Sequence, residues 1–339
     1  MITLSVRLPT TFFVFALLAC AFCCRGWAGD RPPAAASSRS ASPTRRPTST
    51  LVYGPGGYAN PTLSNPVNPL SYGADNTGVN SSSDAFQNAV NAGDVLIPAG
   101  TYKITTQISV PNNRNVRCAD PATVTISFPQ STNGYAFLWA GTGPGSIANC
   151  TFTGTNTAHP AGYVAANQWN HFVEIEYGAH DIWVGNNYFR NCWGNACVHT
   201  YTNDNKPATN NIIIRNNQFE NCGIYGPTTD ATTNQYIVYN IAVDCTIGPE
   251  SDDSLQPKNT GLIEQNQIIR KFGTGWENIG GVALSFTCGW ANGLDYSGMI
   301  CANNQGAFSA PATHLPWLYG TMVVGHGTYV NNHGFVVKN

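Results

Sequence analysis

The chain has 339 residues, of which 34 are Gly and 21 are Pro, and only 10% are charged. Abundant Asn, Thr, Gly, Val and Ile with few helix formers favour strands joined by many turns and exclude a helical bundle. Residues 1–50 hold six of the 16 basic and one of the 18 acidic side chains. This leaves 10 − 17 = −7 charges on residues 51–339, which argues against a nucleic-acid partner.

The first 28 residues have the pattern of a secretory signal peptide. Arg7 gives a positive start, an apolar run covers residues 11–24, and a small residue precedes the expected cleavage position. We therefore expect a secreted protein, extracellular or periplasmic, whose mature chain begins near Gly29 and has no membrane span. The alternatives are an uncleaved anchor, for which the run is shorter than the roughly 20 residues needed, and a lipoprotein attached through Cys20.

Residues 29–50 form a Pro-, Ser- and Ala-rich stretch with scattered Arg, which predicts a disordered linker. Residues 51–339 have the length of one large domain. Eight of the 11 cysteines lie in this domain, an even number that predicts disulfides in an oxidising compartment. Within residues 51–339 neither a CxxC pair nor a Cys/His zinc spacing occurs, so the cysteines give little support to a metal site.

A short helix and a strand are predicted near the start of the domain. Residues 84–92 place Phe86, Ala89 and Val90 on one helical face, and Asp84 can cap this helix. The next segment, Val95-Leu-Ile-Pro-Ala-Gly-Thr-Tyr102, is a strand interrupted by a turn. Such a helix can shield the open end of a stacked structure.

One internal repeat organises the middle of the chain. Residues 181–192 align with residues 211–222 at an offset of 30 without a gap and with six identities. A third copy occupies residues 261–268, and a weaker one occupies residues 147–152. A strand, an Asn bend and a second strand, repeated every 20–50 residues, is typical of a solenoid in which each coil buries its neighbour.

The repeat predicts an all-β fold, a single-stranded right-handed parallel β-helix. We expect an N-terminal cap over residues 67–104 with a short helix, coils over residues 105–306, and a C-terminal cap over residues 307–339. The alternative is a β-sandwich whose Asn-rich turns are coincidental.

Equivalent positions of stacked coils lie ~4.8 Å apart and form ladders of like side chains. The expected Asn ladder consists of Asn186, Asn187, Asn216, Asn217 and Asn266. The expected apolar ladder consists of Phe189, Phe219 and Ile268. The expected disulfides are Cys192–Cys222, Cys118–Cys150 and Cys288–Cys301.

Residues 71–104 resemble the opening of the pectate-lyase-like superfamily, in the form found in pectate lyases and rhamnogalacturonases. Ser71-Tyr-Gly-Ala-Asp75, the helix over residues 84–92 and the strand over residues 95–102 carry most of the family pattern. Asn76 replaces the family's Gly, which affects a turn only. With the Asn-turn repeats the resemblance covers residues 67–285 and implies the same β-helix. The superfamily includes polysaccharide lyases, glycoside hydrolases, epimerases, tailspikes and non-catalytic proteins, so the resemblance implies the fold and no single reaction.

The resemblance implies a substrate groove along the sheet formed by the strands that precede the Asn-turn strands. These strands are residues 171–177, 196–201, a segment near 224–227, and 282–286. Alternation places Glu174, Glu176 and His199 on the outer face, with His199 stacked over Glu176. Two carboxylates at i and i+2 lie about 6.6 Å apart at Cα, within reach of the spacing used in glycoside hydrolysis. These three residues are the first catalytic candidates, and the alternative is an ordinary solvated strand face.

Asp252 and Asp253 are the second catalytic candidates. They resemble the paired Asp of polygalacturonase-type hydrolases, which a Gly-His-Gly motif follows. Here a Gly-His-Gly motif occurs at residues 325–327, and its His326 lies 73 residues after Asp253. The Arg-x-Lys that normally follows is missing. Both departures count against this assignment.

Substrate binding and a lyase reaction call for aromatic and basic side chains. The expected substrate-binding residues are Trp193, Tyr201, Arg215 and Tyr225. A lyase would need a Lys or Arg base, for which Arg215, Lys206 and Lys258 are available. It would also need a Ca²⁺ ion, which Asp204, Asp230 and Asp244 could bind. No other cofactor is expected, and the charge of −7 disfavours unaided binding of a polyanionic glycan.

The sequence thus supports two hypotheses. The first is a secreted enzyme that cleaves glycosidic bonds in a polysaccharide, as a glycoside hydrolase or a polysaccharide lyase. The second is a non-catalytic β-helix that binds glycans or acts as a surface adhesin. The sequence does not specify the glycan or the oligomeric state.

Overall fold

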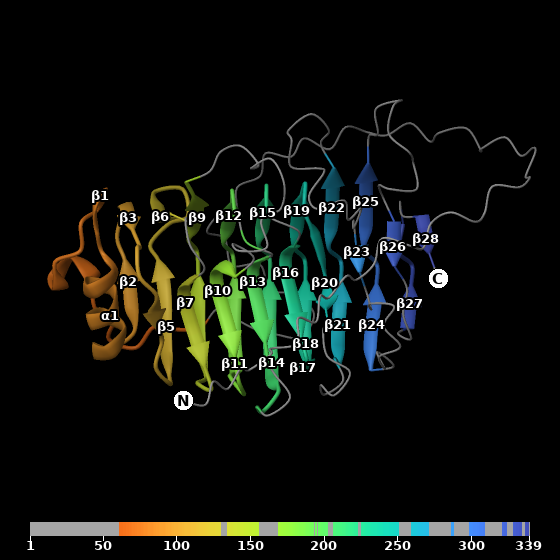
Figure 1. Ribbon diagram of the computed structural model, residues 1–339, viewed down its shortest axis with the longest axis horizontal. Helices are drawn as coiled ribbons and strands as arrows, with labels where there is room; N and C mark the ends of the chain where they lie inside the picture. Colours follow the sequence, from red (N-terminus) through yellow and green to blue (C-terminus); the bar gives the residue numbers. More distant parts are fainter. Residues whose placement is uncertain are drawn as a thin grey trace, which may run out of the picture. The chain divides into compact units, whose positions relative to one another are not determined.

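The computed structural model describes residues 61–129, 134–155, 169–192, 194, 196–202, 206–222, 225–250, 259–270, 286–287, 298–308, 321–323, 328–333 and 336–338. In these residues the chain winds through three long parallel sheets as a right-handed parallel β-helix (Figure 1). The expected fold class is confirmed. The sandwich alternative is wrong, because strands one coil apart pair in parallel.

The strands fall into four sheets. Sheet 1 contains β1 (Thr77–Ser81), β3 (Gly100–Lys103), β6 (Val124–Phe128), β9 (Thr151–Gly154), β12 (Tyr188–Arg190), β15 (Gln218–Glu220), β19 (Ile241–Val243), β22 (Gln267–Arg270) and β25 (Gln305–Phe308). Sheet 2 contains β2 (Val95–Ile97), β5 (Arg114–Cys118), β8 (Gly145–Ala148), β11 (His180–Gly185), β14 (Thr209–Arg215), β18 (Gln235–Val238), β21 (Gly261–Glu264), β24 (Met299–Ala302) and β27 (Thr328–Val330), with β17 (Thr232–Thr233) beside β14. Sheet 3 contains β4 (Ile108–Ser109), β7 (Gly134–Ala140), β10 (Asn170–Glu176), β13 (Ala196–Tyr201), β16 (Tyr225–Asp230) and β20 (Thr246–Glu250). A small fourth sheet contains β23 (Phe286–Thr287), β26 (Thr321–Val323) and β28 (Val336–Lys338).

One coil runs through sheet 3, then sheet 2, then sheet 1, as β10, β11 and β12 do before β13, β14 and β15. The 30-residue repeat is one such coil, because Ile182 pairs with Ile212 and Phe189 pairs with Phe219. The sequence offset therefore measures the path once around the solenoid.

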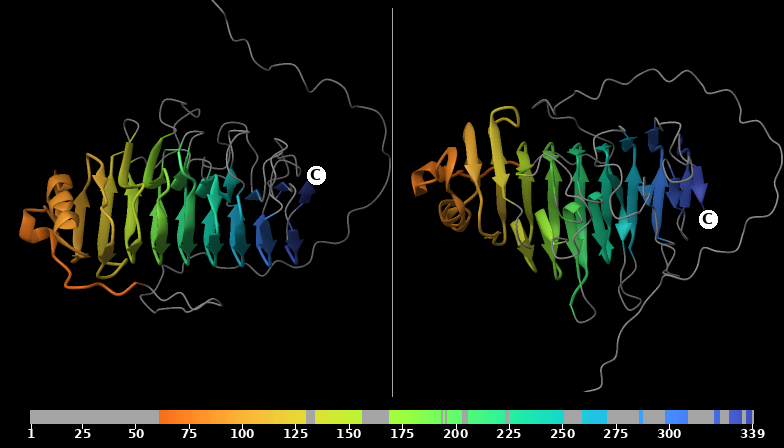
Figure 2. Two further views of the ribbon diagram at one scale, coloured as in Figure 1. Left: turned by 90° about the horizontal axis from the view of Figure 1, so that it is seen from below. Right: turned by 45° about the horizontal axis from the view of Figure 1, so that its top comes forward.

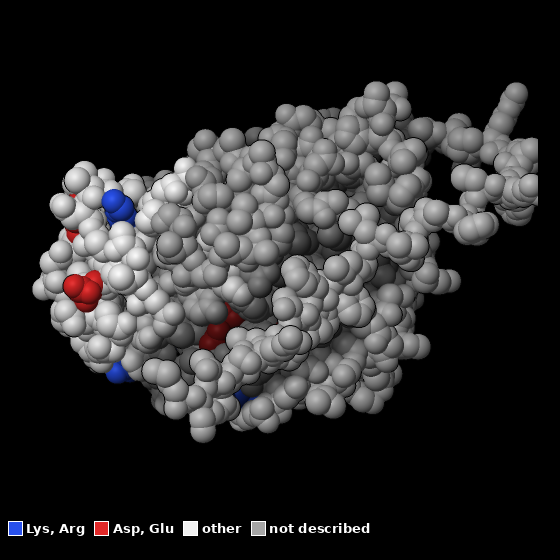
Figure 3. Space-filling model, in the orientation of Figure 1, with Lys and Arg blue, Asp and Glu red and all other residues white. Residues whose placement is uncertain are grey.

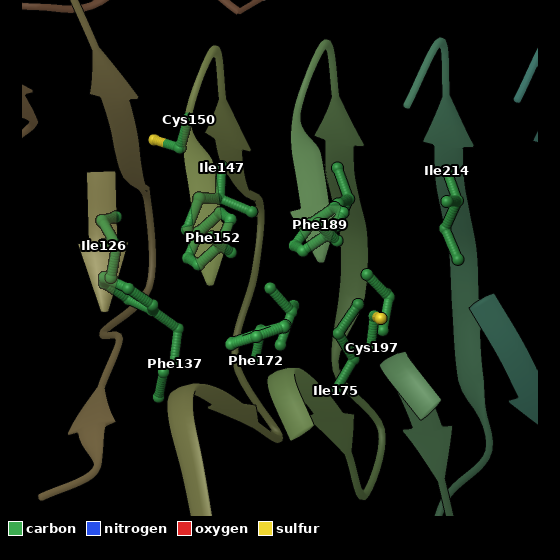
Figure 4. Close-up of a cluster of buried hydrophobic side chains, with 14 of the residues drawn as sticks. Ile126, Phe137, Ile147, Cys150, Phe152, Phe172, Ile175, Phe189, Cys197 and Ile214 are labelled. Atoms are coloured by element: carbon green, nitrogen blue, oxygen red, sulfur yellow. The ribbon is translucent and has the colours of Figure 1, made fainter. Parts of the chain in front are cut away.

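The core lies inside the coils and consists of one side chain from each inward position of the strands. Phe152, Phe189 and Phe219 stack on successive coils, with ring centroids 4.8 Å and 5.1 Å apart. Figure 4 shows Phe152 and Phe189 in this interior, with Phe172 beside them. The predicted apolar ladder is confirmed, with Ala242 between Phe219 and Ile268. Stacked rings fill the interior where each coil must bury its neighbour.

An Asn ladder stabilises the bend between sheets 2 and 1. In this column each side-chain oxygen after that of Asn187 accepts from the backbone N–H and the amide of the preceding coil's Asn, as Asn217 does from Asn187 at 3.0 Å and 3.1 Å. The column contains Asn187, Asn217, Asn240, Asn266, Asn304 and Asn332. The residue before it has a left-handed backbone, as at Asn186 and Asn216, and forms a second, more exposed pair. The predicted ladder is confirmed and is longer than expected.

A short helix covers the N-terminal end of the coils. Helix α1 (Ser83–Ala92) buries Phe86, Ala89 and Val90, as predicted. It begins one residue earlier than expected, so Asp84 lies in its first turn and does not cap it. A 3₁₀ helix, η1 (Pro69–Tyr72), precedes β1. Both views of Figure 2 show this helical segment at one end of the stack of coils.

Parallel pairing continues beyond residue 306, where the sequence loses its repeat. Strand β27 pairs with β24, and Asn332 extends the Asn ladder by one more coil. The C-terminal segment thus adds strands to the stack instead of ending it at residue 306.

Two disulfides with both cysteines among the described residues join neighbouring coils. Cys118–Cys150 is confirmed, with Cα atoms 5.1 Å apart. The predicted Cys192–Cys222 pair is wrong, since Cys222 bonds Cys197 and the Cys192 thiol donates to the Ala196 carbonyl at 3.1 Å. Cys197 enters on the interior side of β13, so it reaches the coil interior beside Cys222. Cys301 is disulfide-bonded, and its expected partner Cys288 lies outside the described residues.

Residues 1–60, with the expected signal peptide and linker, also lie outside the described residues, so those assignments stay predictions. Within the described part of the chain, the helices are too short and too polar to cross a bilayer.

Candidate functional site

The first catalytic candidates lie on the outer face of sheet 3, on β10 and β13. Val173, Ile175 and Val198 point into the core, which places the intervening residues outside. The register pairs Glu174 with His199 and Glu176 with Tyr201. The expectation that His199 stacks over Glu176 is therefore wrong. Paired residues of β10 and β13 are 25 positions apart in the sequence, so His199 lies beside Glu174, two residues before Glu176.

Glu174 lies between two histidines. Its Oε1 is 2.8 Å from Nδ1 of His199, and its Oε2 is in contact with Nδ1 of His171. Glu174 and His171 are fully buried, and His199 is 4% exposed. His171 reaches the outer face because Phe172 and Val173 both belong to the core, which interrupts the alternation of β10. Sequence periodicity gives no sign of this interruption, and His171 was not among the predicted site residues.

The two carboxyl groups have opposite ionisation tendencies. Burial opposes ionisation of Glu174, but the charges and hydrogen bonds of His199 and His171 outweigh it and lower the pKa of Glu174. Burial, followed by the neighbouring charge of Glu174, raises the pKa of Glu176 to about 7. Burial and both carboxylates raise the pKa of Tyr135, which is hydrogen-bonded to Glu176. One carboxyl is therefore held ionised beside another that favours its protonated form.

Glu176 opens onto a pocket of about 440 Å³ with aromatic walls. The pocket is lined by Gly134, Tyr135, Trp169, Glu176, Tyr177 and Tyr201. The Trp169 ring meets the rings of His171, His199 and Tyr201 edge-on, with centroids 5.4–6.1 Å apart. Figure 3 shows Asp or Glu atoms in a recess of the face that carries sheet 3. The arrangement is one carboxyl group surrounded by flat apolar rings.

Sheet 3 also aligns acidic residues along its outer face. Glu176 pairs with Tyr201 on the next strand, His199 pairs with Thr228, and Asp230 lies two residues beyond Thr228 on β16. Asp230 is thus on the same row as Glu176, two strands away, and it is 3% exposed. The sequence indicates Asp230 only as a calcium ligand, because its row on the sheet becomes known only when the pairing of the strands is known.

The other candidates lie elsewhere. Arg215 ends β14 in sheet 2, where its guanidinium is 5.2 Å from the centre of the Tyr239 ring. Tyr225 begins β16 and is 1% exposed, so its ring has no open face. Lys206 lies over the Tyr177 ring at 5.7 Å, at the edge of the pocket. Trp193, Asp204, Asp252, Asp253 and Lys258 lie outside the described residues.

Comparisons with known proteins find solved structures that are similar at low sequence identity. No family model and no curated protein matches the chain. A surface adhesin of Streptococcus pneumoniae, PfbA, is 12% identical over 80% of this chain and 81% of its own, with a TM-score of 0.48. The A-module of the Azotobacter vinelandii mannuronan C-5 epimerase AlgE4 is 11% identical over 78% and 76%, with a TM-score of 0.41. The catalytic domain of a GH87 alpha-1,3-glucanase, in complex with tetrasaccharides, is 17% identical over 73% and 41%, with a TM-score of 0.49. At these identities the likeness concerns the fold alone.

Proposed function

We propose that this protein is a secreted enzyme that hydrolyses glycosidic bonds of a polysaccharide on the outer face of sheet 3. The observation that carries the proposal is the position of Glu176, a carboxyl group in a pocket whose walls are one Trp and three Tyr rings. The inter-coil disulfides fit an oxidising, extracellular compartment.

The aromatic walls supply the binding surface. Sugar rings have flat apolar faces, and Tyr and Trp side chains offer matching flat surfaces together with a polar edge. Tyr201 and Tyr177 lie on adjoining coils with ring centroids 6.0 Å apart, so successive rings follow the axis of the solenoid. A linear glycan lying along that axis would contact one ring after another.

Glu176 and Asp230 form the catalytic pair in this proposal. Their strands are two apart, which places their Cα atoms about 9.6 Å from each other, and rotation of the side chains can bring the carboxyl groups closer than this. Inverting glycosidases hold their two carboxyl groups roughly 6.5–9.5 Å apart, which leaves room for a water molecule. Glu176, buried and next to the charge of Glu174, acts as the acid that protonates the leaving oxygen. Asp230 acts as the base that activates the water.

Glu174 does not act on the substrate directly. It is fully buried, and its two oxygens are occupied by His171 and His199. Its contribution is the negative charge that favours the protonated form of Glu176. The sequence-based pair Glu174–Glu176 is thus replaced by Glu176 with Asp230.

The second candidate function is glycan binding without cleavage, because the ring-lined pocket serves an adhesin as well as an enzyme. A panel of polysaccharides, incubated with the protein with and without Ca²⁺, separates the two. New reducing ends without absorbance near 235 nm support hydrolysis, absorbance near 235 nm identifies a lyase, and binding without either product supports the adhesin.

The variants Glu176→Gln and Asp230→Asn test the assigned roles. Each should lower hydrolysis at least a hundredfold, as loss of a general acid or base does. Only Glu176→Gln should regain rate on aryl glycosides with good leaving groups, because these need no protonation. Glu264→Gln on β21 of sheet 2 is the matched control and should keep full activity. Equal, full rates in both site variants would refute the assignment.

A further inference from the structure

The cluster of His171, Glu174 and His199 is built from the side chains that bind transition metals. Two imidazole nitrogens and one carboxylate oxygen lie within 4.8 Å of one another on β10 and β13. The proposed hydrolysis uses none of these three groups on the substrate. Glu174 contributes only its charge to that reaction, and binding of a cation by the three groups can be tested without a glycan.

We infer that His171, Glu174 and His199 form a binding site for a divalent transition-metal ion of the zinc type. The donor set is two imidazoles and one carboxylate, which Zn²⁺, Co²⁺ and related ions accept with a fourth position left for water or substrate. Ca²⁺ and Mg²⁺ are disfavoured, because they take six or more oxygen ligands.

The donor atoms lie close enough to meet at one ion after the side chains rearrange, since they are within 4.8 Å of one another and each histidine contacts a different oxygen of Glu174. Zinc binds nitrogen and oxygen at about 2.0–2.1 Å, which in a tetrahedron sets ligand atoms about 3.3 Å apart. Nδ1 of His199 and Oε1 of Glu174 are 2.8 Å apart, so the two side chains need to separate by about half an ångström. The protons now shared between the imidazoles and the carboxylate would leave as the metal enters.

Burial gives the site a reason to bind a cation. The Glu174 carboxylate is fully buried on the outer face of β10, and removing such a charge from water is costly unless a positive charge accompanies it. A metal ion supplies that charge at a single point between both histidines.

Aromatic rings enclose the site. Tyr135 stacks on His171 with centroids 5.7 Å apart, and Tyr201 stacks on His199 at 6.0 Å. Trp169 meets both histidines edge-on. These contacts fix the orientation of the imidazoles and keep the surroundings apolar, and both effects strengthen metal binding in protein sites.

Titration with Co²⁺ tests the inference. The untagged protein is treated with a chelator, titrated with Co²⁺, and followed by its visible absorption and by metal analysis after dialysis. We expect one ion per chain, visible bands of a four-coordinate site, and displacement by one equivalent of Zn²⁺. Absence of stoichiometric Co²⁺ and Zn²⁺ binding would overturn the inference.

Two matched variants locate the ion. His199→Gln keeps the size and a donor toward Glu174 but should weaken Co²⁺ binding at least tenfold. His180→Gln changes the exposed His180–Asp181 pair, 2.8 Å apart, and should leave binding unchanged. Unchanged affinity in His199→Gln would place the ion elsewhere. If that variant does not fold, X-ray absorption of the Co²⁺-loaded wild type decides, since an all-oxygen shell overturns the site. No glycan is present in these measurements, so failure of the proposed hydrolysis leaves their outcome unaffected.

Discussion

Replacing Asn217 by Ala tests the Asn ladder at its centre. The Asn217 side chain donates to the Val184 carbonyl at 3.0 Å and to Oδ1 of Asn240 at 3.1 Å. Its own Oδ1 accepts from the backbone N–H and the amide of Asn187 at 3.0 Å and 3.1 Å. The substitution removes all four hydrogen bonds in a region that water does not reach, since Asn217 is 2% exposed.

The expected loss of stability follows from those four contacts. A hydrogen bond contributes about 1 kcal/mol net, and a buried group left without a partner costs roughly 1–3 kcal/mol. The Val184 carbonyl and the N–H of Asn187 both lose their side-chain partner. We therefore expect the free energy of unfolding to fall by about 4 kcal/mol.

Urea unfolding followed by tryptophan fluorescence measures this loss. The control is Asn216→Gly one residue earlier, where φ is 53° and the side chain makes the more exposed contact with Asn186. Glycine accepts that backbone conformation without strain, so the control should lose less than about 1 kcal/mol. If both variants lost the same small amount, the buried column would not be a source of stability.

Three further predictions concern other parts of the molecule. Cys197→Ser should lower the free energy of unfolding by about 3 kcal/mol, because Cys197–Cys222 closes a 25-residue separation, and peptide mapping that found Cys192–Cys222 would contradict the pairing. Tyr201→Ala should weaken oligosaccharide binding about tenfold, equivalent to about 1.4 kcal/mol, as measured by titration calorimetry. Tyr236→Ala on sheet 2 should leave the dissociation constant unchanged. Hydrogen bonds from Thr77 and Asn80 lower the pKa of Asp75 in the folded protein. Its carboxylate therefore stabilises the fold at pH values above the unfolded-state pKa of about 4, and this stabilisation is lost as the pH falls through the lower pKa of the folded state. The urea midpoint of Asp75→Asn should accordingly lie below that of the wild type at pH 6 and approach it in acid; a constant difference would exclude this role of Asp75.

The fold could be predicted from the sequence because its periodicity is local. Asn187 and Asn217 repeat every 30 residues with Phe189 and Phe219, and each position needs only its counterpart on the next coil. Asn240 escaped the prediction because its coil is 23 residues from Asn217, so the repeat length changes there. The stacked geometry continues across such changes as long as the bend keeps its Asn.

The candidate site could be predicted only in part. Alternation placed Glu174, Glu176 and His199 on one face, and the structure keeps them there. The neighbours of each residue depended on coil length, so His199 came to lie beside Glu174. The position of His171 on the outer face depends on an interruption of the alternation at Phe172 and Val173, and the hydrophobic pattern of the sequence does not predict this interruption. Contacts between coils depend on loop lengths, and these lengths can be assigned only when the ends of the strands are known.

The Asn column ends at Cys150, whose backbone N–H donates to Asn187 at 2.9 Å and whose sulfur bonds Cys118. At this point the link between coils changes from hydrogen bonds to a covalent bond. The resistance to a force applied along the solenoid axis would therefore differ from one part of the solenoid to another. Coils held together by hydrogen bonds alone could separate one at a time, whereas the coils joined by Cys118–Cys150 and by Cys197–Cys222 would remain tethered until a reductant cut the bonds.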